Sequence, residues 1–130
     1  MREVSDEEFD AMIQRAMSEL PAEYMVNLNN VAITYDDEPT PEQLAANNIG
    51  AHQLLLGLYE GVPQTARLSS SYSGVLPDKI TLFKDSIRAV TTTDEEFFEQ
   101  IKRTLWHEIA HHYGLNHDRI RTIERQQAQE

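Results

Sequence analysis

Eleven residues near the end of the sequence could bind and use a metal ion. They form an H-E-x-x-H-x-x-G-x-x-H pattern, written out as His107-Glu108-Ile109-Ala110-His111-His112-Tyr113-Gly114-Leu115-Asn116-His117. Two histidines four residues apart on a helix point the same way, so His107 and His111 can bind one ion. Gly114 can end that helix in a left-handed conformation and turn the chain back to deliver His117 as a third ligand. Three neutral imidazoles with one open position are typical of a catalytic zinc site.

Glu108 stands beside these histidines, where a general base for a metal-activated water belongs. The plain alternative is a carboxylate that forms a salt bridge on the helix surface. The water to be activated would lie within one helical turn of Glu108. The role of general base is therefore the preferred interpretation.

The third ligand position has two candidates, His117 and Asp118, since a carboxylate also suits zinc. His117 is preferred because it completes the extended spacing. Asp118 would then accept an imidazole N–H, or it would be the N-cap of a last helix over Arg119–Gln127. His112 points about 100° away from His111 around the helix, so we expect a surface or partly buried histidine there and not a ligand.

A long helix is predicted to carry this motif. Thr93-Asp94-Glu95-Glu96 reads as a capping box, with Thr93 as the N-cap and Glu96 reaching back. The segment Asp94–Tyr113 contains no Pro or Gly, and its apolar residues recur at three- and four-residue steps. This apolar face comprises Phe97, Phe98, Ile101, Leu105 and Ile109. The predicted ligands therefore lie on the last turns of an anchored helix.

The rest of the chain is predicted to be one helix followed by three strands. Residues 6–19 form an amphipathic helix behind a capping box at Ser5, and the helix ends near Pro21. The strands are expected at Val26–Tyr35, Leu54–Glu60 and Lys79–Phe83. Smaller features lie between them: a short helix or a plain loop at 40–46, a loop at Gln64–Gly74 and a helical turn at Asp85–Val90.

This order of elements predicts a single α+β domain over residues 1–130. A small twisted sheet of about three to four strands would pack against the N-terminal helix and the zinc-bearing helix. The pattern leaves parallel and mixed strand pairing both open. No internal repeat and no linker divides the sequence.

The amino-acid composition limits which metal ligands and which partners the protein can have. The sequence has no cysteine, so a metal must be held by His, Asp or Glu. A net charge of −11 repels nucleic acid and anionic membranes. The first residues are acidic and lack the apolar run of a signal peptide, and no stretch approaches the ~20 apolar residues of a membrane span. We therefore expect a cytoplasmic protein without nucleic-acid or membrane partners.

The motif resembles that of the zincin metallopeptidases, and its extended form is similar to that of the metzincins. The length, the element order and the near-terminal motif resemble the small bacterial minimal-zincin family, as does the segment Gly57–Pro63 less specifically. This resemblance implies a zincin-like fold, a peptide or protein substrate, and zinc held by His107, His111 and His117 with Glu108 catalytic. Metzincins have a methionine turn after the third ligand, whereas no methionine follows His117 here. From this comparison we also expect the protein to lack the C-terminal subdomain that usually forms one wall of the substrate cleft.

Two other functions stay open. A family of bacterial rRNA-processing metal hydrolases has three histidines at this spacing, but it has Gly where this chain has Glu108. The negative charge also opposes RNA binding, which relies on Lys and Arg. The second alternative is a non-catalytic protein in which zinc holds the C-terminus to the helix and the surface binds a partner. Metal removal would then unfold the protein, and Glu108→Ala would leave its function unchanged.

A peptidase also needs an oxyanion donor and a place for its substrate. Tyr72 and His112 are candidate donors, as is Tyr113, for which packing at the helix end is the preferred interpretation. An edge strand beside the metal helix could bind an extended peptide by strand addition. The strands predicted at Leu54–Glu60 and Lys79–Phe83 are both candidates for that edge.

Overall fold

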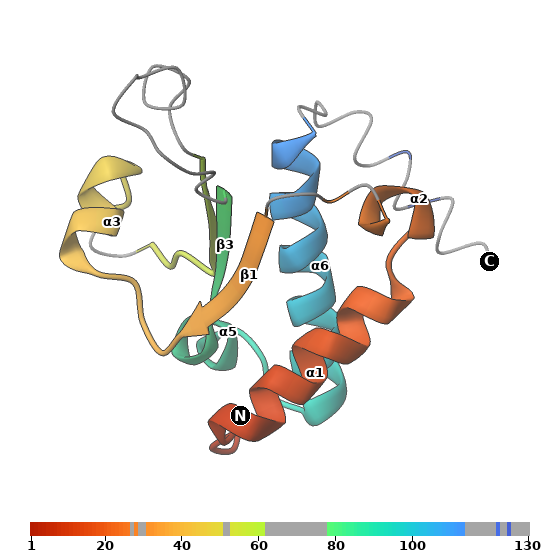
Figure 1. Cartoon of the computed structure of the whole chain (residues 1–130). Helices are drawn as coiled ribbons and strands as arrows, with labels where there is room; N and C mark the ends of the chain where they lie inside the picture. The colour runs from red at the N-terminus through yellow and green to blue at the C-terminus, as the bar shows by residue number, and fades with distance from the viewer. Residues whose placement is uncertain are drawn as a thin grey trace, which may run out of the picture.

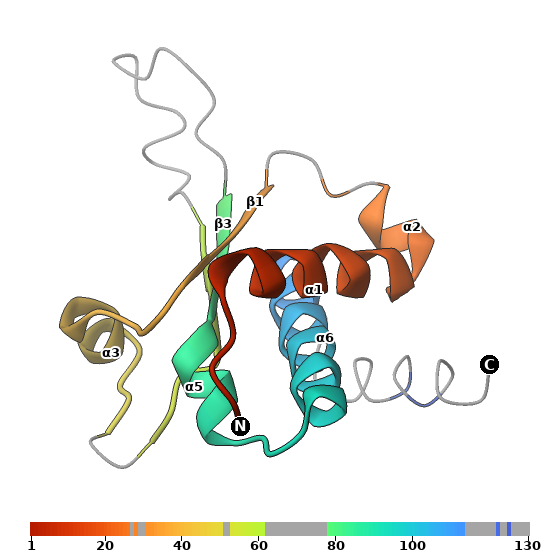
Figure 2. The same ribbon diagram turned by 90° about the horizontal axis from the view of Figure 1, so that it is seen from below.

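The computed structural model describes residues 1–26, 28, 31–50, 53–61, 78–113, 122 and 125. Within this part of the chain, three strands form one sheet, and helices lie on both sides of it (Figures 1 and 2). The strands are β1 (Val31–Asp36), β2 (Gly57–Glu60) and β3 (Asp78–Phe83). The helices are α1 (Asp6–Glu19), α2 (Ala22–Met25), α3 (Pro41–Ala46), α5 (Lys84–Ala89) and α6 (Asp94–His112). The predicted α+β class is confirmed.

The sheet is mixed, with the order β1-β3-β2. β1 runs parallel to β3, with Val31 opposite Asp78, whereas β2 runs antiparallel to it, with Gly57 opposite Leu82. The strand predicted at Lys79–Phe83 is therefore central, and its candidacy as the edge is wrong. A central strand is covered on both faces, in keeping with the burial of every side chain from Ile80 to Phe83. β2 is the edge strand that contacts α6.

Several predicted boundaries shift. The strand expected at Val26–Tyr35 is found as β1 from Val31 to Asp36, and Val26 instead caps the short helix α2 with a helical backbone. Pro21 is the N-cap of α2, with φ −57°, and a proline there is compatible with the start of a helix. The strand expected at Leu54–Glu60 shortens to β2. The helical reading of 40–46 is confirmed, since Thr40 and Gln43 form both hydrogen bonds of a capping box.

The main core lies between the sheet and the helices α1 and α6. Figure 2 shows these two helices on one side of the sheet and α3 on the other. The Phe9 ring of α1 meets Phe97 of α6 edge-on at 5.7 Å and Tyr35 of β1 at 5.4 Å between centroids. Edge-to-face pairs of this kind add to the stabilisation from burial. Phe9 thus joins both helices to the sheet.

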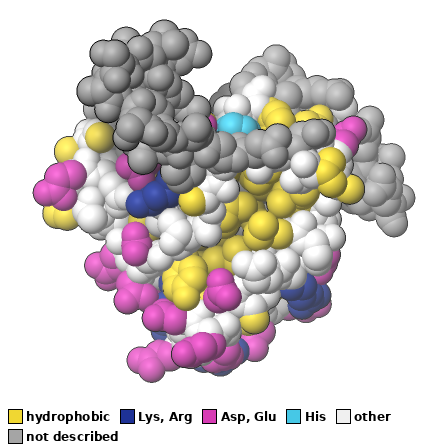
Figure 3. Space-filling view, in the orientation of Figure 1, with side chains coloured by type: hydrophobic (Ala, Val, Ile, Leu, Met, Phe, Trp, Pro, Cys, Tyr) yellow, Lys and Arg dark blue, Asp and Glu magenta, His cyan; other side chains and the backbone are white. Residues whose placement is uncertain are grey.

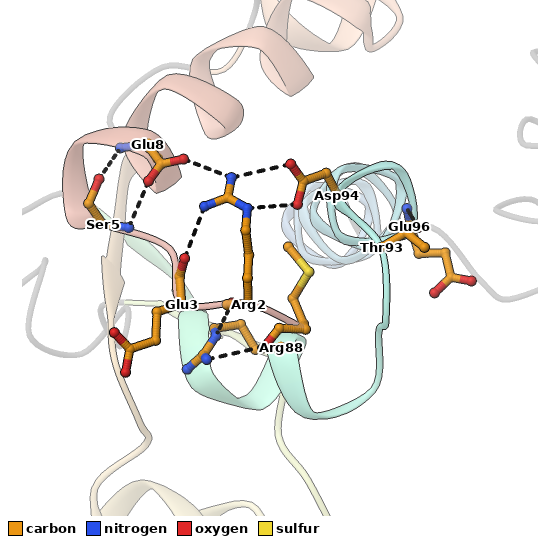
Figure 4. A network of polar contacts seen from close by, with 9 residues as sticks. Arg2, Glu3, Ser5, Glu8, Arg88, Thr93, Asp94 and Glu96 are labelled. Atoms are coloured by element: carbon orange, nitrogen blue, oxygen red, sulfur yellow. Dashed lines mark hydrogen bonds and ion pairs between the residues drawn. The ribbon is translucent and has the colours of Figure 1, made fainter.

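The first residues of the chain are fixed by a network that we call the base clamp, made of Arg2, Glu8, Arg88 and Asp94 (Figure 4). The Arg2 guanidinium donates to Glu8 at 2.8 Å and to Asp94 at 2.9 Å. Arg88 donates to the Arg2 carbonyl at 2.9 Å. The clamp therefore ties the N-terminal segment and α1 to α5 and to the first turn of α6.

Acidic side chains dominate the charged surface. In the face shown in Figure 3, Asp and Glu gather around the lower part, and a band of hydrophobic side chains crosses the middle of the molecule. No helix in the described ranges is long and apolar enough to cross a membrane.

Candidate metal centre at the end of α6

Local sequence signals set the start and the rotation of α6. The Thr93 side chain accepts the Glu96 N–H at 3.1 Å, which confirms the predicted N-cap. The Glu96 carboxylate accepts mainly from Thr92, through its N–H at 2.9 Å and its hydroxyl at 2.6 Å, and the backbone of the expected partner Thr93 adds a smaller effect that also lowers the pKa of Glu96. The apolar face predicted from Phe97 to Ile109 is buried. The turns that carry the histidines lie at the end of the helix opposite to the base clamp.

His107 is oriented by its own helix. Its Nδ1 lies 3.2 Å from the Arg103 carbonyl, one turn earlier. A carbonyl can only accept, so Nδ1 is the donor and Nε2 carries the lone pair in the neutral ring. Metal-binding histidines commonly have one ring nitrogen fixed in this way. His111 follows one turn later, with 47 % of its side chain exposed.

Glu108 is buried, with 9 % of the residue exposed. Its Oε2 lies 3.5 Å from Nδ1 of His111, and the backbone N–H of Tyr59 in β2 acts on the pKa of the same carboxyl. Burial raises the pKa of the Glu108 carboxyl, while His111, the Tyr59 N–H and His107 act in the opposite direction. This environment differs from the exposed surface ion pair that the sequence left as an alternative.

A second polar group lies next to this carboxylate, formed by Tyr59, Asp78 and His112. The Tyr59 hydroxyl donates to Asp78 Oδ2, and it lies 3.2 Å from Nδ1 of His112. His112 Nδ1 lies 3.5 Å from Asp78 Oδ2. The side chains of Asp78 and His112 are only 11 % and 20 % exposed, so the expectation of a partly buried histidine at 112 is confirmed.

The sequence pattern by itself assigns no role in the site to Tyr59 or Asp78. Tyr59 falls within the segment Gly57–Pro63, whose resemblance to the minimal-zincin family was the one available signal. Asp78 had no signal, because only the antiparallel pairing of β2 with β3 brings it beside Tyr59. Both positions depend on contacts between residues that are distant in sequence.

Tyr113 ends α6 in a packed position. Its hydroxyl donates to the Tyr24 carbonyl at 2.6 Å, and its ring meets the Tyr24 ring edge-on at 5.3 Å between centroids. The preferred interpretation of Tyr113, as an aromatic residue packed at the helix end, agrees with these contacts.

The close approach of β2 to α6 requires Gly57. A Cβ atom at this position would lie 2.6 Å from Cγ2 of Thr104 in α6 and 3.1 Å from Cδ2 of Leu82. The first distance is far below van der Waals contact, so only a residue without a side chain allows the strand to lie this near the helix. Gly57 thereby brings the Tyr59 backbone within reach of Glu108.

The structure brings together His107, Glu108 and His111. The third predicted ligand, His117, and its competitor Asp118 lie outside the described residues, as do Gly114 and the predicted loop Gln64–Gly74 with its candidate donor Tyr72. Among the residues that are described, no three His, Cys, Asp or Glu side chains form a group able to hold a metal ion.

A small mixed sheet packed on a helix that ends in H-E-x-x-H defines the class of zincin-like folds. Residues 28–127 match the family described as zincin-like metallopeptidase, and because the match covers well over half of its length, the chain belongs to this family. A solved structure of a conserved hypothetical protein from Thermus thermophilus is similar to it, with a TM-score of 0.57 and 23 % identity, over 85 % of this chain and 94 % of that one. This likeness shows a shared fold. No curated protein sequence matches the chain.

Proposed function

We propose that this protein is a zinc-dependent metallopeptidase in which His107, His111 and His117 hold zinc and Glu108 is the general base. Membership of the zincin-like metallopeptidase family supports a zinc peptidase in general terms. The observation that carries the specific proposal is the buried Glu108 carboxylate, which contacts His111 and the backbone of edge strand β2. A buried carboxylate beside imidazoles is a typical candidate for acid–base chemistry.

The described donors suit zinc. His107 and His111 lie on successive turns of one helix, and the Arg103 carbonyl orients the first imidazole. Because the chain has no cysteine, imidazole and carboxylate are the ligands it can offer. Bound zinc supplies a Lewis acid that polarises a peptide carbonyl and makes a water molecule more acidic.

Glu108 accepts a proton from the attacking water and passes it to the leaving amine nitrogen. A base works best when its pKa lies near the working pH, and burial shifts the pKa of Glu108 upward, in that direction. The contacts with His111 and the Tyr59 N–H limit the rotation of the carboxylate. A carboxylate fixed before substrate arrives needs little rearrangement during the reaction.

The edge strand β2 offers a place for an extended substrate. The Phe83 N–H donates to the Leu56 carbonyl at 3.0 Å, and hydrogen-bonded pairs alternate along an antiparallel ladder. The register then directs the backbone groups of Gly57 and the carbonyl of Tyr59 away from β3, whereas the Tyr59 N–H acts on Glu108. A peptide that adds to this edge would lie beside the Glu108 turn of α6. The net charge of −11 favours peptides with basic residues.

The test uses an unbiased peptide mixture with zinc-loaded wild type, Glu108→Ala and Glu99→Ala, followed by mass spectrometry. Glu99 is an exposed glutamate on the same helix and provides the matched control. We expect cleavage by wild type and Glu99→Ala, and a loss of roughly 10³-fold in Glu108→Ala with zinc still bound. Absence of cleavage by all three zinc-loaded proteins would favour the non-catalytic zinc protein. Metal-dependent cleavage of RNA without cleavage of peptides would favour the rRNA-processing alternative.

A further inference from the structure

Tyr59 contacts the Glu108 site through two separate groups. Its backbone N–H lowers the pKa of the Glu108 carboxyl, and its side-chain hydroxyl donates to Asp78. The residue therefore links the carboxylate of α6 to the first residue of the central strand β3. It does so from β2, which in the described part of the chain is an edge strand paired with β3 alone.

The hydroxyl is fixed by both of its neighbours. A phenol has one proton, and the Asp78 carboxylate can only accept, so the Tyr59 proton goes to Asp78. His112 Nδ1 is then the donor in its 3.2 Å contact with the phenol oxygen. On another side, a Cβ atom at Gly61 would lie 3.2 Å from this oxygen, so the chain passes close to it. The phenol of Tyr59 thus has a defined position.

The backbone N–H of Tyr59 is directed away from β3 and not into the sheet. The alternation of hydrogen bonds along the pair of β2 and β3 places it on the outer side of the edge strand. An N–H on that side of an edge strand has no partner in the ladder, so pairing within the sheet does not fix its position. Here the side chain of the same residue is anchored to β3 and to the last turn of α6. The anchor therefore belongs to the same residue as the N–H that acts on the Glu108 carboxyl.

We propose that Tyr59 is the positioning residue for Glu108: its hydroxyl, held by Asp78 and His112, fixes β2 so that its N–H orients the Glu108 carboxylate. The effect of Tyr59 on the rate of peptide cleavage rests on the proposed function, since it requires Glu108 to be the general base. The geometric part concerns the hydrogen bond alone and can be measured without any activity.

The decisive variant is Tyr59→Phe, which removes the hydroxyl but keeps the ring and the backbone N–H. Tyr113→Phe is the matched control, because it removes another phenol hydroxyl that donates a hydrogen bond at the same end of α6. The first readout is hydrogen exchange of the amide at position 59, followed by NMR. An outward-facing amide of an edge strand is protected only if its acceptor is in place.

We expect this amide to be protected in wild type and in Tyr113→Phe. It should exchange roughly tenfold faster in Tyr59→Phe and in Glu108→Ala, as the loss of one hydrogen bond to a charged acceptor implies. Equal exchange in wild type and Tyr59→Phe would overturn the proposal. So would an amide that is unprotected in wild type.

The second readout is the peptide assay, with zinc content measured in parallel. Tyr59→Phe should lower kcat roughly tenfold with KM within about twofold and zinc content unchanged, because a misoriented base slows the chemical step more than binding. Tyr113→Phe should stay near wild type, although both variants lose one hydrogen bond. Unchanged kcat in Tyr59→Phe would overturn the role in turnover. A wild type that protects amide 59 but cleaves no peptide would refute the proposed function and leave the positioning contact confirmed.

Discussion

The two ends of α6 are held by different kinds of contact. At the start of the helix, the base clamp joins Arg2 to Glu8 and Asp94 through ion pairs whose side chains are 44–60 % exposed. At the end, Glu108 and the group of Tyr59, Asp78 and His112 make their polar contacts in partly buried surroundings. Exposed ion pairs contribute little each, whereas buried polar groups are costly to disturb. The base clamp is thus expected to contribute little to stability, whereas the far end holds the contacts on which the proposed chemistry would depend.

The largest difference between the two ends should appear in zinc affinity. His107→Ala removes a proposed ligand and should weaken zinc binding by more than about 100-fold, since loss of partners that merely support ligands already costs 10- to 100-fold. Arg2→Ala, at the other end of the same helix, should leave zinc affinity within about twofold. Titration calorimetry on the two variants measures both values. Equal zinc affinities in His107→Ala and Arg2→Ala would contradict the proposed difference between the two ends of α6.

A smaller effect is expected from Gly57→Ala, which forces a Cβ atom to within 2.6 Å of Cγ2 of Thr104. Such overpacking costs about 1–3 kcal/mol in the free energy of unfolding and should push β2 away from α6. Thr104→Ser removes the clashing methyl group but keeps the hydroxyl that accepts from Gln100. Chemical denaturation should therefore show that the double variant recovers much of the stability lost in Gly57→Ala. A double variant that is no more stable than Gly57→Ala would show that the close approach is not the cause.

The smallest effect concerns the base clamp and its dependence on pH. The hydrogen bond from Arg2, followed by that from Ser5, lowers the pKa of Glu8 from its usual 4.5 to about 2. Stability from this group is therefore fully present above about pH 4.5 and is lost as the pH falls toward 2. The difference in urea midpoint between wild type and Glu8→Gln should be small at neutral pH, because the pair is exposed, and should vanish near pH 2. A difference that grows on acidification would contradict this account of the clamp.

Local signals predicted the two long helices well. Capping residues and apolar periodicity act within a few residues of the chain, so α1 and α6 begin at Asp6 and Asp94 as expected. The spacing of His107, Glu108 and His111 on one helix likewise follows from helix geometry alone. These features needed no knowledge of the rest of the fold.

Contacts between distant segments could not be predicted in the same way. The central place of β3 in the sheet depends on which strands pair, and alternating side chains do not specify this. The group of Tyr59, Asp78 and His112 comes from three elements that meet only after pairing and packing. The short helix α2 was missed because four residues give too little periodicity to detect.

The most direct test of the central claim is the position of zinc in crystals grown with one equivalent of the metal, located by anomalous scattering. The account predicts one strong peak about 2.0–2.1 Å from the Nε2 atoms of His107 and His111, with His117 as the third protein ligand. A peak elsewhere in the molecule, or ligation through Asp118 with neither histidine of α6, would contradict it.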